Sequence, residues 1–228
     1  MGDGVFGNPI TDITLKGLPE YEGKDIIVGG LPEYEGKKIR NIDRARVAMR
    51  WKNAERKDFN ALQYVQNLKE NCEDNVATLC LIYNATGDVV EYAAHYDQLG
   101  HLGAAPYPSI IENGQWGAFL HRKVTDGYYS GSVGGVVYRG KNGDDADCDW
   151  LVAWNNPTDK NKWVNRAYTE VREINHFNGI WNAIHGRMDA SGVHSKSESH
   201  GCLSYASIGS DRFAIFRAIL TLQNVFQK

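Results

Sequence analysis

Cysteine is scarce in this sequence. The 228 residues include four cysteines, and no two of them have the spacing of a CxxC motif. A disulfide-stapled domain needs a denser framework, and zinc or redox motifs use closely spaced pairs. We therefore expect Cys72, Cys80, Cys148 and Cys202 to be free thiols.

Long apolar runs and a strong excess of one charge are also missing. No run approaches the ~18–20 apolar residues that span a bilayer. The formal net charge of -3 argues against specific nucleic-acid binding. The first residues, MGDGVFGNPI, lack the basic head and apolar core of a secretory signal. These features predict an intracellular, cytoplasmic protein.

The Walker and GxSxG motifs of nucleotide-binding proteins and hydrolases are absent from the sequence. Gly131 to Gly135 lies inside a strand-like run, so it cannot present helix N–H groups to a phosphate. The acidic turn around Asp144, Asp145, Asp147 and Asp149 lacks the Gly and the distal Glu of an EF-hand loop. We expect no cofactor and no bound metal.

Residues 1–40 contain many turn formers and a repeat. The motif GLPEYEGK occurs at Gly17–Lys24 and again at Gly30–Lys37. Two copies are too few for a solenoid, which needs about three or more units. We interpret residues 1–40 as an extended arm that lies over the body or is partly disordered.

Residues 41–75 have a helical character. Ala61, Tyr64, Val65 and Leu68 follow the spacing of an amphipathic helix, with Asp58 as its N-cap. A basic helix over residues 43–54 is expected to precede it. The segment 37–57 holds nine Lys or Arg residues against two acidic ones. This segment is either a peripheral membrane contact or a solvated helix face.

Residues 76–228 read as a series of short β-strands separated by turns. This pattern is typical of a β-sandwich. The predicted strands are 76–83, 89–96, 116–121, 133–138, 150–154, 166–173 and 203–208, with a helix at 177–188 and a Ser- and His-containing loop at 190–201. The run 215–222 fits a strand, but Phe213, Phe216 and Leu220 also fit the period of a helix.

The runs 133–138 and 150–154 are joined by a Gly- and Asp-rich turn, which predicts a hairpin. The second run continues to Pro157, where the missing N–H donor should end the ladder. A polar loop carrying Trp163 follows. A rigid hairpin that delivers such a loop to a sheet end often presents a binding site. Alternatively, Trp163 packs beneath its own loop.

The seven histidines are the place to look for catalysis. Cys202 with His200 or His185 could form a thiol nucleophile and its base, and His176 or His185 could carry a proton. A zinc site using His194, His200 and Cys202 lacks an evident fourth ligand. Gly201-Cys202-Leu203 also resembles the start of a buried strand. These residues are the only catalytic candidates, and an enzyme is the less favoured reading.

Several segments together resemble the plant jasmonate-induced protein family. The matching segments are GVFGNPI, LIYNATGD, PYPSIIENGQWGAFLH, GGVVYRG and DWLVAWNNP. They cover most of residues 76–222, with a weaker match in the N-terminal helices. The duplicated GLPEYEGK departs from that pattern. The resemblance implies a stress-induced plant protein.

A more distant likeness links the chain to actinoporin-type cytolysins and fungal lectins. It implies a mainly β protein, a β-sandwich with flanking helices and an N-terminal helical segment, that binds phosphocholine lipids or sugars. The residues that the likeness places in the ligand site are Val133, Asn155, Pro157, Trp163, Phe177 and Trp181. Lys160 and Lys162 enter the same loop and would repel a choline cation. An anionic headgroup, a sugar or no ligand therefore remain open, and pore formation is not expected.

The sequence thus favours a non-catalytic binding protein that recognises a lipid headgroup or glycan at one end of a sandwich. The alternatives are an enzyme or biosynthetic accessory protein acting on a small molecule in the same pocket, and a storage or structural stress protein. A homo-oligomer is compatible with each of these functions.

Overall fold

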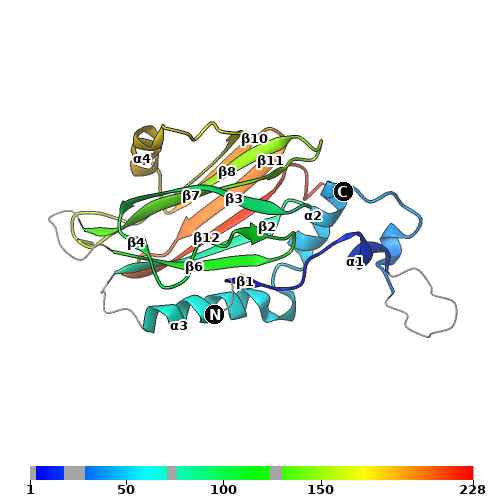
Figure 1. Ribbon diagram of the computed structural model, residues 1–228, viewed down its shortest axis with the longest axis horizontal. Helices are drawn as coiled ribbons and strands as arrows, with labels where there is room; N and C mark the ends of the chain where they lie inside the picture. Colours follow the sequence, from blue (N-terminus) through cyan, green and yellow to red (C-terminus); the bar gives the residue numbers. More distant parts are fainter. Residues whose placement is uncertain (1–3, 18–28, 71–75, 124–129, 228) are drawn as a thin grey trace.

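Two β-sheets packed face to face form the body of the protein, with helices on their outer faces (Figure 1). The computed structural model describes residues 4–17, 29–70, 76–123 and 130–227. The larger sheet has the order β1-β6-β2-β12-β11-β10, with β4 on β6, and the smaller has the order β5-β3-β7-β8-β9. This arrangement confirms the predicted sandwich with flanking helices.

The strands have the following bounds. The larger sheet contains β1 (Val5–Phe6), β2 (Ala77–Ala85), β4 (His101–Leu102), β6 (Trp116–Arg122), β10 (His194–Ser199), β11 (Cys202–Ile208) and β12 (Phe213–Leu222). The smaller contains β3 (Val90–Leu99), β5 (Ile110–Ile111), β7 (Gly131–Lys141), β8 (Asp147–Pro157) and β9 (Arg166–Glu173). The helical segments are α1 (Asp12–Lys16), η1 (Pro32–Tyr34), α2 (Asn41–Arg50), η2 (Ala54–Arg56), α3 (Lys57–Glu70) and α4 (Trp181–Asp189).

The core between the sheets is built around large aromatic side chains. Trp154 is fully buried, and its ring centroid lies 5.7 Å from those of Phe119 and Phe216. Trp150 and Tyr138 fill the core farther along the hairpin. These rings come from β6, β7, β8 and β12, so the aromatic residues join the two sheets into one hydrophobic unit.

Residues 215–222, for which the sequence allowed either a strand or a helix, belong to strand β12. It lies between β2 and β11, parallel to β2 and antiparallel to β11. Phe216, Ala218 and Leu220 are fully buried, whereas Arg217 between them is exposed. The period of two therefore decides the structure, and the helical alternative for residues 215–222 is wrong.

The predicted hairpin is confirmed, with longer strands and a shorter turn. Strands β7 and β8 pair continuously from Gly131 with Pro157 to Lys141 with Asp147. The side-chain oxygen of Asn142 accepts hydrogen bonds from the N–H groups of residues 144 and 146, which closes the turn. Strand β8 ends at Pro157, where the sequence predicted its end, although the N–H of Thr158 still donates to the carbonyl of Ser130 at 3.0 Å.

The N-terminal arm is packed on the body rather than extended throughout. Strand β1 pairs with β6, α1 and η1 form short helices, and Leu15 is fully buried. In the second GLPEYEGK copy Tyr34 is also buried. Residues 18–24 of the first copy lie outside the described residues.

Helices α2 and α3 cover part of the outer face of the larger sheet, and α4 covers the smaller one (Figure 1). Three details of the sequence interpretation are wrong. Asp58 lies within the first turn of α3 and is not its N-cap. The helix expected at 177–188 begins at Trp181. The loop expected at 190–201 contains β10. None of the described helices has both the length and the apolar character needed to cross a membrane.

Candidate functional site

A pocket of about 860 Å³ opens at the end of the sandwich where β7 begins and β8 ends, beside α4. We call it the corner pocket. Its walls come from the ends of β3, β7, β8 and β9, from α4, and from the loop 158–165. The lining residues are Gln98, Leu99, Ser130, Val133, Asn155, Pro157, Thr158, Asp159, Lys162, Trp163, Val164, Arg166, His185 and Asp189.

The structure brings together four of the six residues that the resemblance placed in a ligand site. Val133, Asn155, Pro157 and Trp163 all line the corner pocket. Phe177 does not. It is 2% exposed and packs against the cluster between α4 and the smaller sheet. Because α4 starts at residue 181, Phe177 belongs to the preceding turn and serves the core.

Trp181 lies beside the corner pocket rather than in it. Its ring stacks on Tyr96, with centroids 5.0 Å apart and an interplanar angle of 11°. Trp181 lines a small adjoining hollow that shares Gln98, Val133 and His185 with the corner pocket. Trp181 therefore supports the wall of the corner pocket, and it does not form an aromatic cage with Trp163.

The loop 158–165 presents two apolar side chains to solvent at the rim of the pocket. Trp163 is 56% exposed and Val164 is 60% exposed. The loop is ordered by a turn in which the N–H of Trp163 donates to the carbonyl of Asp159 at 3.0 Å. The alternative that Trp163 packs beneath its own loop is therefore wrong.

A buried polar network holds this loop from below. The ammonium of Lys160 donates to the side-chain oxygens of Asn156 and Asn165. Asn156 Nδ2 donates to the carbonyls of Ala77 (3.0 Å) and Arg212 (2.9 Å), which belong to the larger sheet and its adjoining loop. Burial lowers the pKa of Lys160 to about 8. Lys160 thus points under the loop, away from the position in which it would repel a ligand cation.

The corner pocket carries both signs of charge. Lys162 Nζ lies 3.7 Å from Asp159 Oδ2, and His185 Nδ1 lies 3.5 Å from Asp189 Oδ2. Asn155 Nδ2 donates to Asp189 Oδ1 at 3.2 Å, while Asn155 Oδ1 is buried and accepts no hydrogen bond from the described residues. With Arg166, the lining offers two permanent cations, two carboxylates and an unused amide acceptor.

A second polar network lies behind the strand ends that line the pocket. His121 is fully buried, and its Nδ1 is 2.8 Å from Ser132 Oγ. Its Nε2 faces Asp97 Oδ1 at 3.3 Å, and Tyr107 donates to the same carboxylate oxygen at 2.9 Å. Ser132 precedes Val133, so the network fixes the strand that forms the pocket floor.

We expect His121 to make the protein less stable in mild acid. Burial lowers the pKa of His121 below the ordinary histidine value of about 6.5, so the unfolded chain binds the proton more readily than the folded chain. The free energy of unfolding should therefore fall as the pH drops below about 6.5, by at most about 1.4 kcal/mol per pH unit for this residue. Urea denaturation from about pH 7.5 to 5 measures the slope.

A His121→Asn variant should lose this contribution to the slope, although it is less stable at neutral pH. The matched control is His101→Asn, since His101 is exposed on the neighbouring strand β4. An unchanged slope in His121→Asn would assign the acid sensitivity to other groups.

The remaining catalytic candidates lie apart from the pocket. His176 pairs with Glu173 at 2.9 Å, and His200 lies 3.7 Å from the same residue. Cys202 is fully buried, and both its contact with the Cys148 thiol and its burial raise its pKa. Of the four candidates, only His185 lines the corner pocket. Among the described residues no three His, Cys, Asp or Glu side chains gather as metal ligands.

The basic segment 37–57 lies at the other end of the sandwich (Figure 1). Asn41 at the start of α2 donates to Asn142 and Asp145 in the β7–β8 turn, whereas the pocket lies at the opposite end of this hairpin. Eleven residues of β7 separate the two ends by about 35 Å. Several cations of the basic segment 37–57 already form ion pairs: Arg44 pairs with Asp12, and Arg50 pairs with Glu33.

Comparisons with known proteins agree with this fold. The model of the Nakanori-like protein family matches residues 6–223. The 23 kDa jasmonate-induced protein of Hordeum vulgare is 40% identical over 213 residues, which are 92% of this chain and 93% of that protein.

Solved structures give the same result. The crystal structure of the lipid binding protein Nakanori superposes with a TM-score of 0.77 and 26% identity, covering 95% of this chain and 98% of its own. A lectin of Xerocomus chrysenteron reaches a TM-score of 0.40 at 9% identity over 64% of this chain, which is too remote to support a conclusion. The chain therefore belongs to the Nakanori-like protein family and is a relative of the jasmonate-induced proteins, as the resemblance of its segments indicated.

Proposed function

We propose that this protein is a non-catalytic binding protein of the plant stress response that recognises a phosphate-bearing lipid headgroup in the corner pocket. The observation that carries the proposal is the exposed pair Trp163 and Val164 on the rim of a pocket of mixed charge. The relationship to the 23 kDa jasmonate-induced protein of Hordeum vulgare and the structural similarity to the lipid binding protein Nakanori support this class of protein.

The rim residues suit a membrane surface better than a free solute. A tryptophan places its apolar ring among the acyl chains and its indole N–H among the headgroups, so it is favoured at membrane interfaces. Trp163 and Val164 are adjacent and protrude together. When a lipid headgroup is bound in the pocket, both side chains would enter the membrane interface and be removed from water.

The charges of the lining suit a headgroup that contains a phosphate. Lys162 and Arg166 can donate hydrogen bonds to phosphate oxygens, and such charge-assisted bonds are stronger than neutral ones. Asp189 and the free acceptor Asn155 Oδ1 can receive an ammonium or hydroxyl group of the same headgroup. Because Lys160 is held beneath the loop, the repulsion of a ligand cation is weaker than the sequence suggested.

Vesicle binding tests the proposal. Vesicles of a neutral galactolipid are compared with the same vesicles containing phosphatidylcholine, phosphatidylethanolamine or phosphatidic acid. We expect sedimentation of the protein with at least one phosphate-bearing mixture and none with the galactolipid alone. Binding should persist at high salt, where the Debye length shrinks to about 3 Å, because it depends on the pocket. Equal binding to galactolipid alone would favour glycan recognition instead.

This proposal assigns membrane contact to the corner rather than to the basic segment 37–57. The two surfaces lie at opposite ends of β7, so one flat bilayer cannot meet both. If the basic segment dominated instead, binding would require anionic lipid and would disappear at high salt.

A second candidate function rests on His185. This histidine lies beside Asp189 in the corner pocket, an arrangement that could transfer a proton to or from a small molecule. The two functions are distinguished by His185→Gln, which keeps a polar side chain of similar size. A binding protein should retain vesicle binding in this variant, whereas an enzyme would lose turnover.

A further inference from the structure

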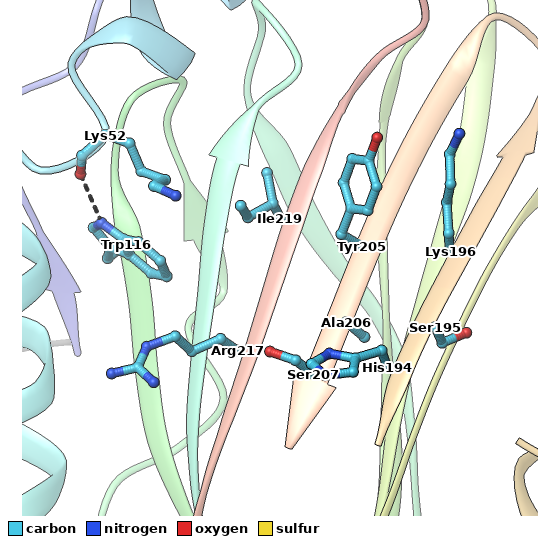
Figure 2. Close-up of a pocket in the computed structure, with 10 residues that line it drawn as sticks. All are labelled: Lys52, Trp116, His194, Ser195, Lys196, Tyr205, Ala206, Ser207, Arg217 and Ile219. Carbon is cyan, nitrogen blue, oxygen red and sulfur yellow. Dashed lines mark hydrogen bonds between the residues drawn. The ribbon is translucent and has the colours of Figure 1, made fainter. Parts of the chain in front are cut away.

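The helices leave part of the larger sheet uncovered on its outer face. Helices α2 and α3 pack over β2 and β6, and the outer faces of β10, β11 and β12 continue beyond them. A hollow of about 500 Å³ lies at this boundary (Figure 2). We call it the sheet-face hollow. Its lining residues are Lys52, Trp116, His194, Ser195, Lys196, Tyr205, Ala206, Ser207, Arg217 and Ile219.

The strand register places the floor of this hollow in two rows. Lys196, Tyr205 and Ile219 are directly paired across β10, β11 and β12. The next row consists of His194, Ser207 and Arg217, two residues along on each strand. Residues two apart share one face of a strand, so both rows point outward together.

The lining is rich in positive charge. Lys52, Lys196 and Arg217 are permanent cations, and no carboxylate of the described residues lines the hollow. Lys196 pairs with Glu198 at 3.0 Å, but in the described part of the chain neither Lys52 nor Arg217 forms an ion pair. Figure 2 shows Lys52 and Arg217 on either side of Trp116. The hollow is therefore complementary to an anion.

The floor also offers a flat apolar surface with hydroxyl groups. Tyr205 lies beside Ile219, and Lys196 Nζ is 5.8 Å from the Tyr205 ring centroid. Trp116 is 3% exposed and is fixed by its indole N–H, which donates to the carbonyl of Lys52 at 3.0 Å. The hydroxyls of Tyr205 and Ser207 can exchange hydrogen bonds with a ligand.

We propose that the sheet-face hollow is a second ligand site, which binds a sugar ring carrying a carboxylate or a phosphate. The ring lies against Tyr205 and Ile219, its hydroxyl groups meet Tyr205 and Ser207, and its acidic group is held by Arg217 with Lys52 or Lys196. The volume is in the range of small-molecule sites. No residue is shared with the corner pocket, so this site is independent of the proposed lipid function.

Titration calorimetry of the full chain tests the site with three probes: galacturonate, glucose 6-phosphate and neutral galactose. We expect at least one acidic sugar to bind at least about tenfold more tightly than galactose, because charge-assisted hydrogen bonds are added. Preference for galacturonate identifies a uronate site, and preference for glucose 6-phosphate identifies a sugar-phosphate site. Equal binding of galactose, or no binding of either acidic sugar, would overturn the proposal.

Two variants separate this site from the corner pocket. Arg217→Gln is an exposed change that should weaken binding of the acidic sugar about tenfold while leaving vesicle binding intact. Trp163→Ala should leave sugar binding unchanged. Unchanged sugar affinity in Arg217→Gln would refute the site, whereas failure of vesicle binding in the wild type would count only against the proposed lipid function.

Discussion

Replacing Trp163 by alanine is expected to abolish binding to phosphate-bearing vesicles without changing the fold. The side chain is 56% exposed, so its removal leaves no cavity and should change the stability by less than about 0.5 kcal/mol. In the complex the same ring would be withdrawn from water. Aromatic residues of this kind contribute about 2–3 kcal/mol to binding, which corresponds to a loss of about 30- to 150-fold in affinity.

Vesicle sedimentation of the two proteins measures the effect, and tryptophan fluorescence gives a second readout. The wild-type emission should shift to shorter wavelength on binding, and the shift should be missing in Trp163→Ala. Phe59→Ala is the matched control, because Phe59 is 46% exposed but lies on α3 outside the pocket. If Trp163→Ala bound vesicles as tightly as the wild type, the rim would have no part in binding.

Replacing Asn156 by alanine is expected to destabilise the protein by about 2–4 kcal/mol. Asn156 is fully buried and donates to the carbonyls of Ala77 and Arg212, and its oxygen accepts from Lys160. The substitution leaves two carbonyls and an ammonium without this partner. Each buried unsatisfied group costs about 1–3 kcal/mol, and groups in one network do not add independently.

Urea denaturation gives the change in the free energy of unfolding. The control is Asn161→Ala, since Asn161 is exposed in the same loop and its substitution should cost less than about 0.5 kcal/mol. Combining Asn156→Ala with Lys160→Met should cost less than the sum of the two single changes, because both act on one network. A cost below about 1 kcal/mol for Asn156→Ala would mean that water replaces the lost bonds.

The sandwich and its hairpin could be predicted because local signals and tertiary structure agree there. The runs at 133–138 and 150–154 are β-branched and aromatic, and both faces of these strands are buried. The end of β8 at Pro157 also agrees with the prediction. The resemblance also indicated that Val133, Asn155, Pro157 and Trp163 lie close together, and all four line the corner pocket at the strand ends.

Strand β10 could not be predicted because its sequence, HSKSES, has no apolar face. It pairs with β11, and its serines face the edge of β9. Ser195 Oγ accepts from the N–H of Thr169 at 3.1 Å, and Ser197 Oγ accepts from the N–H of Val171 at 3.0 Å. These serine hydroxyls accept hydrogen bonds from backbone N–H groups where the two sheets meet, so the strand needs serine at these positions. The resulting polar sequence looks like that of a loop.

The polar networks behind the corner pocket also lacked a local signal. His121 meets Asp97 and Ser132 only because β6, β3 and β7 lie together in space. The rows of the sheet-face hollow likewise depend on the pairing of β10, β11 and β12. Phe177 was misassigned because a shift of four residues in the start of α4 moves a side chain from the pocket wall to the core.

The central position of β12 constrains how a nascent chain acquires this fold. Residues 213–222 complete the larger sheet by inserting between β2 and β11, so β2 has an open edge until these residues leave the ribosome. During that interval the apolar strand β2 is a template for pairing with other chains. Synthesis of residues 213–222 must therefore precede the cooperative closure of the sandwich, and chaperone cover of β2 until then should raise the yield of folded protein.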